Sequence, residues 1–273
     1  MKLVSVIVPY FNNESTVLRA LDSIKCQTYS NIEIILINDG SSDKTKDVVN
    51  KYILDNNKMN FKHIILPENK GPSVARNIGI NQSNGELIAF LDADDSWVNN
   101  KIELQAKVMD NNPELVLIAC DHFIEYNNEK YTKSRSDFKI IEVTFKEKLI
   151  KNRFCTPSVM LRRRCILDYN LKFNENQKFA EDTLFYLQIL RRFKSVKIQA
   201  PLVTLYKPEI SSVGLSSKIL ETEKWELRNF KTLYKENKFI KNNKISLIKL
   251  NLLYLFSFIK FTRRVVKYSL KMR

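Results

Sequence analysis

The chain has 273 residues, of which 44% are hydrophobic and 27% are charged. This composition excludes a disordered chain and predicts a soluble, folded protein with a sizeable core. The net charge of +15 suggests nucleic-acid binding at first, but residues 1–110 carry 12 Lys and Arg against 14 Asp and Glu, and Asn237 to Arg273 carry ten basic residues and no acidic one. The basic excess therefore gathers toward the C-terminus, which argues against a nucleic-acid partner.

The first 125 residues alternate strand-like and helix-like segments. Strands are predicted at Leu3–Val8, Ile32–Ile37, Phe61–Leu66, Glu86–Leu91 and Leu115–Phe123. Helices are predicted at Asn13–Cys26, after the cap Ser41-Ser42-Asp43, at Pro72–Gln82 and at Asn99–Met109. Repeated βα units with nearly continuous apolar strands predict an α/β fold with a Rossmann-like, mostly parallel sheet and helices on both faces.

The second half is less regular. Its predicted elements are a polar hairpin or loop at Glu125–Ser136, a short strand at Val159–Leu161, a helix at Ala180–Phe193, a strand pair at Val196–Tyr206, and helices at Lys218–Tyr234 and Ile245–Leu270. Pro201 interrupts the strand pair.

Cysteine usage favours a cytoplasmic chain, and the N-terminal apolar run is expected to be a first strand. The four cysteines show no CxxC spacing, which predicts neither a zinc site nor a disulfide framework and favours a reducing compartment; they are Cys26, Cys120, Cys155 and Cys165. The apolar run from Leu3 ends at Pro9, which is too short for a signal peptide or a membrane span.

Three carboxylates, Asp92, Asp94 and Asp95, directly follow the fourth predicted strand. Parallel sheets bind ligands at the carboxyl ends of their strands, so we expect these side chains in one cleft with Pro9-Tyr10 and Asn38-Asp39-Gly40. Carboxylate oxygens suit Mg²⁺ or Mn²⁺, and such a cation would stabilise a diphosphate leaving group. The plain alternative is an acidic loop that caps the next helix; the position after a buried strand favours the metal site.

Four segments in this order resemble the signature of family 2 glycosyltransferases. They are Val6-Ile7-Val8-Pro9-Tyr10-Phe11-Asn12, Ile37-Asn38-Asp39-Gly40-Ser41-Ser42-Asp43, Asn69-Lys70-Gly71-Pro72-Ser73-Val74-Ala75-Arg76-Asn77 and Phe90-Leu91-Asp92-Ala93-Asp94-Asp95. The resemblance implies the GT-A fold and an inverting enzyme of the bacterial surface-polysaccharide type. Its donor would be a nucleotide-diphosphate sugar, with a UDP-sugar expected.

The resemblance is close through Phe123 and traceable to about Ser217. It implies a GT-A domain over residues 1–217, with a donor-binding half at 1–124 and an acceptor or catalytic half at 125–217. Residues 218–273 are then a helical, basic C-terminal extension.

For the nucleoside, the resemblance implies that Pro9 and Tyr10 line the base pocket. Asp39 would accept a hydrogen bond from the imide N–H of a uracil, and it can also serve as a turn residue before Gly40. Glu14 is either a neighbour of the base or an ordinary carboxylate at a helix start.

For the diphosphate, the resemblance implies that Arg76 binds the pyrophosphate, because a guanidinium is a natural phosphate clamp. Asp94 would bind Mn²⁺ or Mg²⁺ directly, and Asp92 would contact the ribose or the metal through water. A solvated helix position is the simpler interpretation of Arg76, but its place just after the Gly71-Pro72 turn favours the donor site.

The catalytic base is expected in the segment Lys178-Phe179-Ala180-Glu181-Asp182-Thr183-Leu184-Phe185. The resemblance implies that Asp182 deprotonates the acceptor hydroxyl and that Glu181 positions the acceptor or shares this role. Taken alone, the pair is better explained as acidic residues that a helix dipole favours at an N-terminus; its place after the donor motifs favours the catalytic interpretation.

The C-terminal segment joins the apolar stretch Leu250–Ile259 to several basic residues. The uncharged run between Lys249 and Lys260 has ten residues, short of the ~20 that span a bilayer. It predicts peripheral contact with the anionic inner face of the cell membrane. The resemblance to the family implies a saccharide or lipid-linked glycan as the acceptor, and a lipid-linked acceptor fits such contact. The alternative is a helix that docks on the domain.

Two other classes of protein remain to be weighed. A nucleotidyltransferase would carry a Gly-rich, basic loop after the first strand, where this sequence reads Pro9-Tyr10-Phe11-Asn12-Asn13. A non-catalytic protein that binds nucleotide sugars, a membrane or nucleic acid would give Asp92, Asp94 and Asp182 no shared task. An enzyme is therefore the favoured interpretation.

Overall fold

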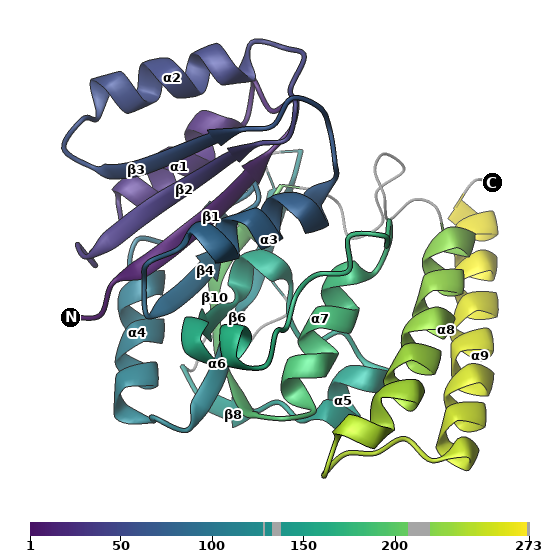
Figure 1. Ribbon diagram of the computed structural model, residues 1–273. Coiled ribbons are helices and arrows are strands. Elements are labelled where there is room, and N and C mark those ends of the chain that lie inside the picture. The colour runs from purple at the N-terminus through teal and green to yellow at the C-terminus, as the bar shows by residue number, and fades with distance from the viewer. Residues whose placement is uncertain (128, 133–137, 207–218, 272–273) are drawn as a thin grey trace.

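The computed structural model describes residues 1–127, 129–132, 138–206 and 219–271. In the first half, strands and helices alternate (Figure 1). The elements of this half are β1 (Val4–Tyr10), α1 (Val17–Lys25), β2 (Ile32–Asn38), α2 (Thr45–Asp55), β3 (Asn60–Ile65), α3 (Pro72–Gln82), β4 (Leu87–Phe90), β5 (Ser96–Trp97) and α4 (Lys101–Asn111). β1 pairs in parallel with β2 and β4, and β2 pairs in parallel with β3, so the predicted βα architecture is confirmed here.

The second half contributes further strands and most of the helical mass. Its elements are β6 (Leu115–Tyr126), β7 (Glu129–Tyr131), β8 (Ile140–Glu142), α5 (Phe145–Ile150), a 3₁₀ turn at Thr156–Ser158, β9 (Met160–Arg162), α6 (Arg163–Asp168), α7 (Glu181–Leu190), β10 (Lys194–Leu205), α8 (Ile219–Lys235), a 3₁₀ turn at Glu236–Phe239 and α9 (Leu247–Lys271).

The described strands join in one sheet, in the order β3-β2-β1-β4-β9-β6-β10-β5. The three-residue strand β9 lies between β4 and β6 and runs antiparallel to both. The predicted strand at Val159–Leu161 therefore exists. In a simple parallel sheet, β6 would pair directly with β4; here β9 is inserted between them.

The predicted strand pair at Val196–Tyr206 is instead one long strand, β10, that pairs in parallel with β6. The pairing register shifts between Ile198 and Pro201 and again between Pro201 and Val203. Proline cannot donate a ladder hydrogen bond, so it lies at an irregularity of the strand rather than at a turn between two strands.

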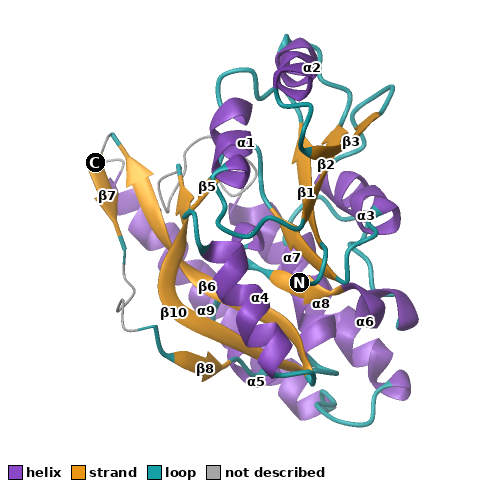
Figure 2. Cartoon of the chain, turned by 90° about the vertical axis from the view of Figure 1, so that its left-hand side faces the viewer, coloured by secondary structure: helices purple, strands orange, loops and turns teal. Residues whose placement is uncertain are grey.

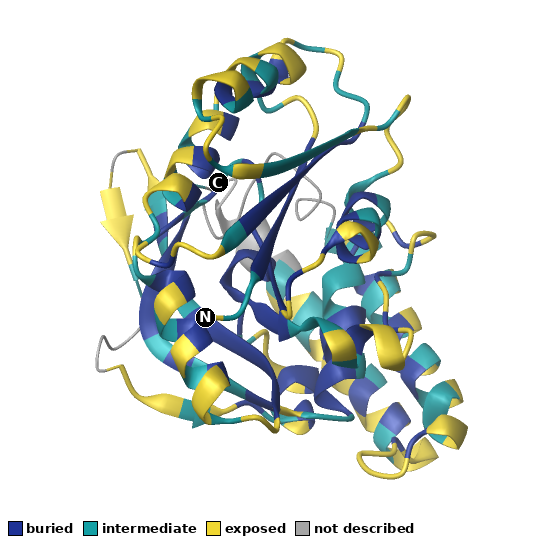
Figure 3. Cartoon of the chain, turned by 60° about the vertical axis from the view of Figure 1, so that its left-hand side comes forward, coloured by how far each residue is buried: buried dark blue, intermediate teal, exposed yellow. Residues whose placement is uncertain are grey.

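Helices cover both faces of the sheet (Figure 2). Alternate residues of β1 belong to different apolar clusters: Val6 and Val8 belong to the cluster that contains residues of α1, α2 and α4, whereas Ile7 belongs to the cluster that contains residues of α3, α5, α6 and α7. This period of two is the pattern of a strand buried on both faces. In Figure 3 the central strands are buried and the exposed residues gather on the outer helices.

The C-terminal extension is an antiparallel pair of helices, α8 and α9, at the side of α7 (Figure 1). Phe230 and Leu233 of α8 and Leu250 and Leu253 of α9 belong to the same apolar cluster as α5 and α7. The extension therefore shares a core with the sheet domain. Within the described ranges, no helix combines the length and the hydrophobicity needed to cross a membrane.

Candidate functional site

The carboxyl ends of β1, β2 and β4 lie at one edge of the sheet. β1 is the middle strand of the three, and Ile7 is opposite Ile35 of β2 and Phe90 of β4. The segments that follow stay in register, because Asp39 donates its backbone N–H to the carbonyl of Tyr10 at 2.9 Å and Leu91 donates to Ile7 at 3.0 Å. The predicted convergence of these strand ends therefore holds in the structure.

Arg76 links this edge to the start of α7. Its Nη2 lies 2.9 Å from Asp92 Oδ1 and its Nη1 lies 3.2 Å from Glu181 Oε1. The side chain is 8% exposed. Burial alone would lower the pKa of the guanidinium, but the two carboxylates outweigh burial and raise it. The structure thus brings together three of the predicted residues, with the carboxylates of Asp92 and Glu181 on either side of the Arg76 guanidinium.

The pair Glu181 and Asp182 begins α7, as the sequence predicts. The preceding residue, Ala180, has the left-handed backbone angles φ 54° and ψ 28°, which are uncommon for a residue other than glycine. Burial raises the pKa of Glu181 to about 7, with a further contribution from Asp182, and Arg76 offsets only part of this rise. Asp182 is half-buried, and its Oδ1 accepts the backbone N–H of Thr183 at 2.6 Å.

The acidic loop after β4 is held by contacts that the sequence does not reveal. Arg19 of α1 donates from Nη2 to the carbonyl oxygen of Asp94 at 2.6 Å, and its guanidinium carbon lies 3.5 Å from the ring centroid of Tyr206. Asp95 is buried, and its Oδ1 accepts the N–H of Tyr206 at 3.3 Å. Arg19 escapes sequence reasoning because the contact joins residues 75 positions apart.

Asp92 and Asp94 remain the two candidate metal ligands. Among the described residues, no group of three His, Cys, Asp or Glu side chains could hold a metal ion. Mg²⁺ and similar hard cations, however, commonly bind one or two protein carboxylates and complete their coordination with water and substrate phosphates. Two half-buried carboxylates at a strand end fit a cation of this shared kind.

Three of the residues predicted for the nucleoside, Pro9, Tyr10 and Asp39, are buried. Asp39 is 4% exposed, and its two carboxylate oxygens accept the backbone N–H groups of Lys70 and Gly71, each at 2.8 Å. Asp39 therefore anchors the turn that starts α3, in addition to any contact with a ligand. The neighbouring Gly40 has φ 69°, and a Cβ there would lie 2.4 Å from the carbonyl carbon of Glu68, so only glycine fits.

Tyr10 and Pro9 are also buried at this strand end. The Tyr10 hydroxyl lies 2.6 Å from Nε2 of His63 on β3, and burial raises the pKa of the phenol. Phe11, the next residue, is 42% exposed. Glu14 is exposed in the turn before α1, which begins three residues later at Val17.

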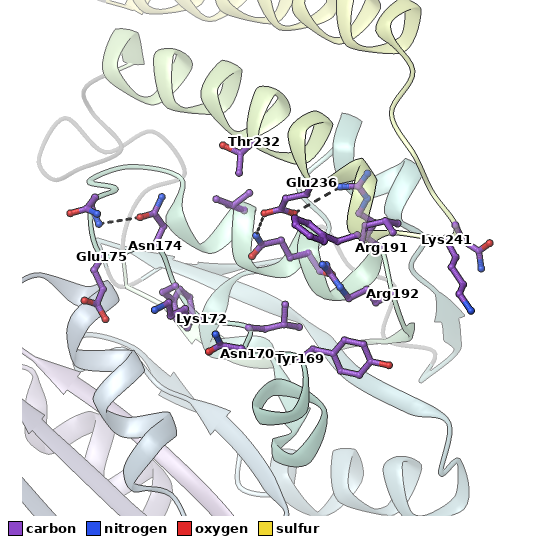
Figure 4. Close-up of a pocket in the computed structure, with 18 residues that line it drawn as sticks. Tyr169, Asn170, Lys172, Asn174, Glu175, Arg191, Arg192, Thr232, Glu236 and Lys241 are labelled. Atoms are coloured by element: carbon purple, nitrogen blue, oxygen red, sulfur yellow. Dashed lines mark hydrogen bonds and ion pairs between the residues drawn. The ribbon is translucent and has the colours of Figure 1, made fainter.

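A separate hollow of about 1130 Å³ lies near the other end of α7 (Figure 4). Tyr169, Arg192 and Lys241 are among its lining residues, and none of the residues predicted for the donor or the base lines it. Arg191, at its edge, donates from Nη1 to the carbonyl of Leu233 at 2.6 Å and so fixes α8 against α7. The convergence of charged groups at the sheet edge, not this hollow, matches the predicted chemistry.

Comparison with known sequences gives a consistent family assignment. Residues 5–170 match the profile of Glycosyl transferase family 2. An uncharacterized glycosyltransferase of Haemophilus influenzae is 32% identical over 225 residues, which are 82% of this chain and 86% of that protein. One from Rickettsia bellii is 31% identical over 78% of this chain, but the match spans only 31% of that longer protein.

Solved structures give the same fold. S. aureus TarS in complex with UDP-GlcNAc superposes with a TM-score of 0.68 at 22% identity, over 95% of this chain and 80% of that chain. The mannosyltransferase PcManGT from Pyrobaculum calidifontis, in complex with GDP-Man and Mn²⁺, has a TM-score of 0.69 at 16% identity, over 93% and 70% of the two chains. The fold is therefore GT-A, and the chain belongs to glycosyl transferase family 2.

Proposed function

We propose that this transferase moves a sugar from a UDP-sugar to a hydroxyl of a saccharide or lipid-linked glycan acceptor, with inversion at the anomeric carbon. The observation that carries the proposal is the position of Arg76 between Asp92 and Glu181. One buried cation thereby connects the loop expected to hold the diphosphate with the helix expected to hold the base. The complex of TarS with UDP-GlcNAc supports the choice of donor class.

On the donor side, Asp94 and Asp92 are proposed to hold Mn²⁺ or Mg²⁺ together with the diphosphate. A cation there would supply charge neutralisation for the departing nucleoside diphosphate. The complex of PcManGT with GDP-Man and Mn²⁺ supports a divalent ion in this fold. Arg76 adds a fixed positive charge, and Asp39 and the backbone of Pro9 and Tyr10 would border the base.

On the acceptor side, Asp182 is proposed to take the proton from the attacking hydroxyl. It lies in the first turn of α7 and is half-buried, so it can reach a substrate. Glu181 faces Arg76 instead, which suits a residue that positions the guanidinium and the helix start. The acceptor oxygen would then attack the face of the sugar opposite the diphosphate in a single displacement.

The biological setting is proposed to be the synthesis of a surface polysaccharide, a capsule or a lipooligosaccharide. Support comes from the resemblance of the four sequence motifs to enzymes of that type and from the basic, partly apolar extension. A panel of nucleotide sugars, assayed for metal-dependent release of UDP, identifies the donor.

The base assignment is tested by Asp182→Asn, which keeps the shape of the side chain and removes its basicity. We expect unchanged binding of UDP with Mn²⁺ in calorimetry and a loss of transfer of about 10²–10⁴-fold. Asp94→Ala is the complementary variant, and it should lose the metal-dependent part of donor binding. Normal turnover in Asp182→Asn would show that another group is the base.

A further inference from the structure

The outward face of α9 carries an exposed apolar stripe. Its members are Ile248, Leu252, Leu255 and Ile259, whose spacings of four, three and four residues place them on one side of a helix. Their exposed fractions are 74%, 60%, 57% and 56%. Phe256 and Phe258 lie beside the stripe and are also exposed.

The stripe is not needed to hold α9 on the protein. The opposite side of the helix carries Leu250, Leu253 and Ser257, all buried. On that side Lys260 pairs with Glu226 of α8, and Arg264 lies 3.5 Å from Glu223. α9 thus has a complete inner face and, in addition, an apolar outer face, which is unusual for a surface helix.

The surroundings of the stripe are positively charged. Lys241 and Lys244 just before α9 and Arg263 on its outer side are exposed, and no described carboxylate pairs with them. The segment from Asn237 to Arg273 has ten basic residues and no acidic one. An exposed apolar stripe with flanking cations is the pattern of a helix that lies in the interface of an anionic bilayer.

The same charges argue against two other occupants. A second copy of the chain docked through this stripe in a twofold contact would bring like cations together. A nucleic acid would bind the cations through its phosphates. Phosphates offer no apolar surface, so the four aliphatic side chains would stay exposed to water.

We propose that α9 docks through this stripe on an anionic lipid surface. α8 lies between α9 and α7 (Figure 1), and Asn229 of α8 donates from Nδ2 to the carbonyl of Ala180 at 2.9 Å. Helices packed side by side are about 8–10 Å apart, which puts the start of α7 about 20 Å from the docked helix. A lipid-linked acceptor held at that surface would have to span this distance to reach Asp182, and that part of the inference rests on the proposed function; the docking itself does not.

The test is co-sedimentation of the full chain with vesicles of phosphatidylcholine and with vesicles that also contain phosphatidylglycerol. We expect binding to the anionic vesicles, little binding to the neutral ones, and weakening by salt. The double variant Leu252→Glu/Leu255→Glu should lose at least about tenfold in affinity, because it removes two leucines that docking would bury and adds two negative charges.

Leu54→Glu is the matched control, because Leu54 lies near the end of α2, away from α9, and is 75% exposed. It should bind vesicles like the unaltered protein, and circular dichroism should show that both variants fold. Equal binding by the double variant, or equal binding to both kinds of vesicle, would overturn the proposal. A double variant that turns a dimer into a monomer in analytical ultracentrifugation would instead assign the stripe to a second copy.

Release of UDP from a soluble donor, measured without vesicles, separates this inference from the proposed function. The double variant should keep that activity, because its changes lie on the outer face of α9. A protein that binds anionic vesicles but hydrolyses no nucleotide sugar would refute the proposed function and leave the docking surface standing.

Discussion

Arg76 is the residue whose environment says most about the site. It is a permanent cation with 8% of its side chain exposed, and its carboxylate partners lie 16 and 105 positions further along the chain. A buried cation between two acids is costly to place in a protein unless the geometry is well satisfied. The two carboxylates satisfy this geometry here, at distances of 2.9 and 3.2 Å.

Arg76→Ala should therefore lower the free energy of unfolding by about 3 kcal/mol, because it leaves Asp92 and Glu181 without their counter-charge. It should also weaken the binding of UDP. Arg164→Ala is a suitable control, since Arg164 is 90% exposed and pairs with Asp168 on the surface, where a pair contributes about 0–1 kcal/mol. Urea denaturation and calorimetry measure both effects, and similar losses in the two variants would contradict this account of Arg76.

Glu181 gives a pH-dependent prediction. Burial, helped by Asp182, raises its pKa from 4.5 to about 7 in the folded protein. Below pH 4.5 the carboxyl holds its proton in both states; between about 4.5 and 7 only the folded protein holds it. Glu181 therefore makes the free energy of unfolding fall as the pH rises through this window.

Glu181→Gln should flatten that fall, whereas Glu68→Gln, at a side chain that is 73% exposed, should leave it unchanged. Denaturation curves at pH 5 and pH 8 for the three proteins measure the difference. If the free energy of unfolding of Glu181→Gln fell with pH as steeply as that of the unaltered protein, the pKa of Glu181 would not be raised by folding.

At the scale of elements, the sequence predicts most of the first half. Continuous apolar runs and the turns after them suffice to locate β1, β2 and β4, and hence to place Asp39 and Asp92 at one edge. The position of β9 in the sheet could not be predicted in the same way. A strand of three residues is too short to show a hydrophobic pattern, and its pairing with β4 and β6 depends on tertiary contacts.

In the candidate site, too, the local features could be predicted from the sequence and the long-range contacts could not. Motif residues next to strand ends could be predicted, but the contact of Arg76 with Glu181 joins residues 105 positions apart. The bonds of Asp39 to Lys70 and Gly71, and of Tyr10 to His63, likewise depend on how α3 and β3 meet β2 and β1. Local sequence carries no record of such partners.

The helix α9 offers a prediction from two adjacent leucines. Leu253 is 6% exposed and belongs to the core shared with α5 and α7, whereas Leu252 is 60% exposed. Leu253→Ala should lower the free energy of unfolding by about 2–5 kcal/mol, and Leu252→Ala by no more than about 0.5 kcal/mol. Thermal and urea unfolding of the two variants measure the difference. Equal losses of stability would contradict the orientation of α9 described here, with Leu253 inward and Leu252 outward.

At the scale of the whole molecule, the chain combines a near-neutral first part with a strongly basic end. The acidic groups at the sheet edge face the proposed diphosphate and cation, and the cations of the extension lie beside an apolar stripe on α9. α8 connects the two regions through Asn229 and Ala180. The net charge of +15 thus comes from the part of the chain after residue 110.

The central claim is that the sugar nucleotide binds across the carboxyl ends of β1, β2 and β4. A crystal structure of the protein with UDP and Mn²⁺ tests it most directly. The account predicts the uracil beside Asp39, the cation on Asp94 and the diphosphate, and Arg76 within hydrogen-bonding distance of a phosphate oxygen. A nucleotide bound elsewhere, for example in the hollow beside Arg192, or a diphosphate with no cation at Asp94, would contradict it.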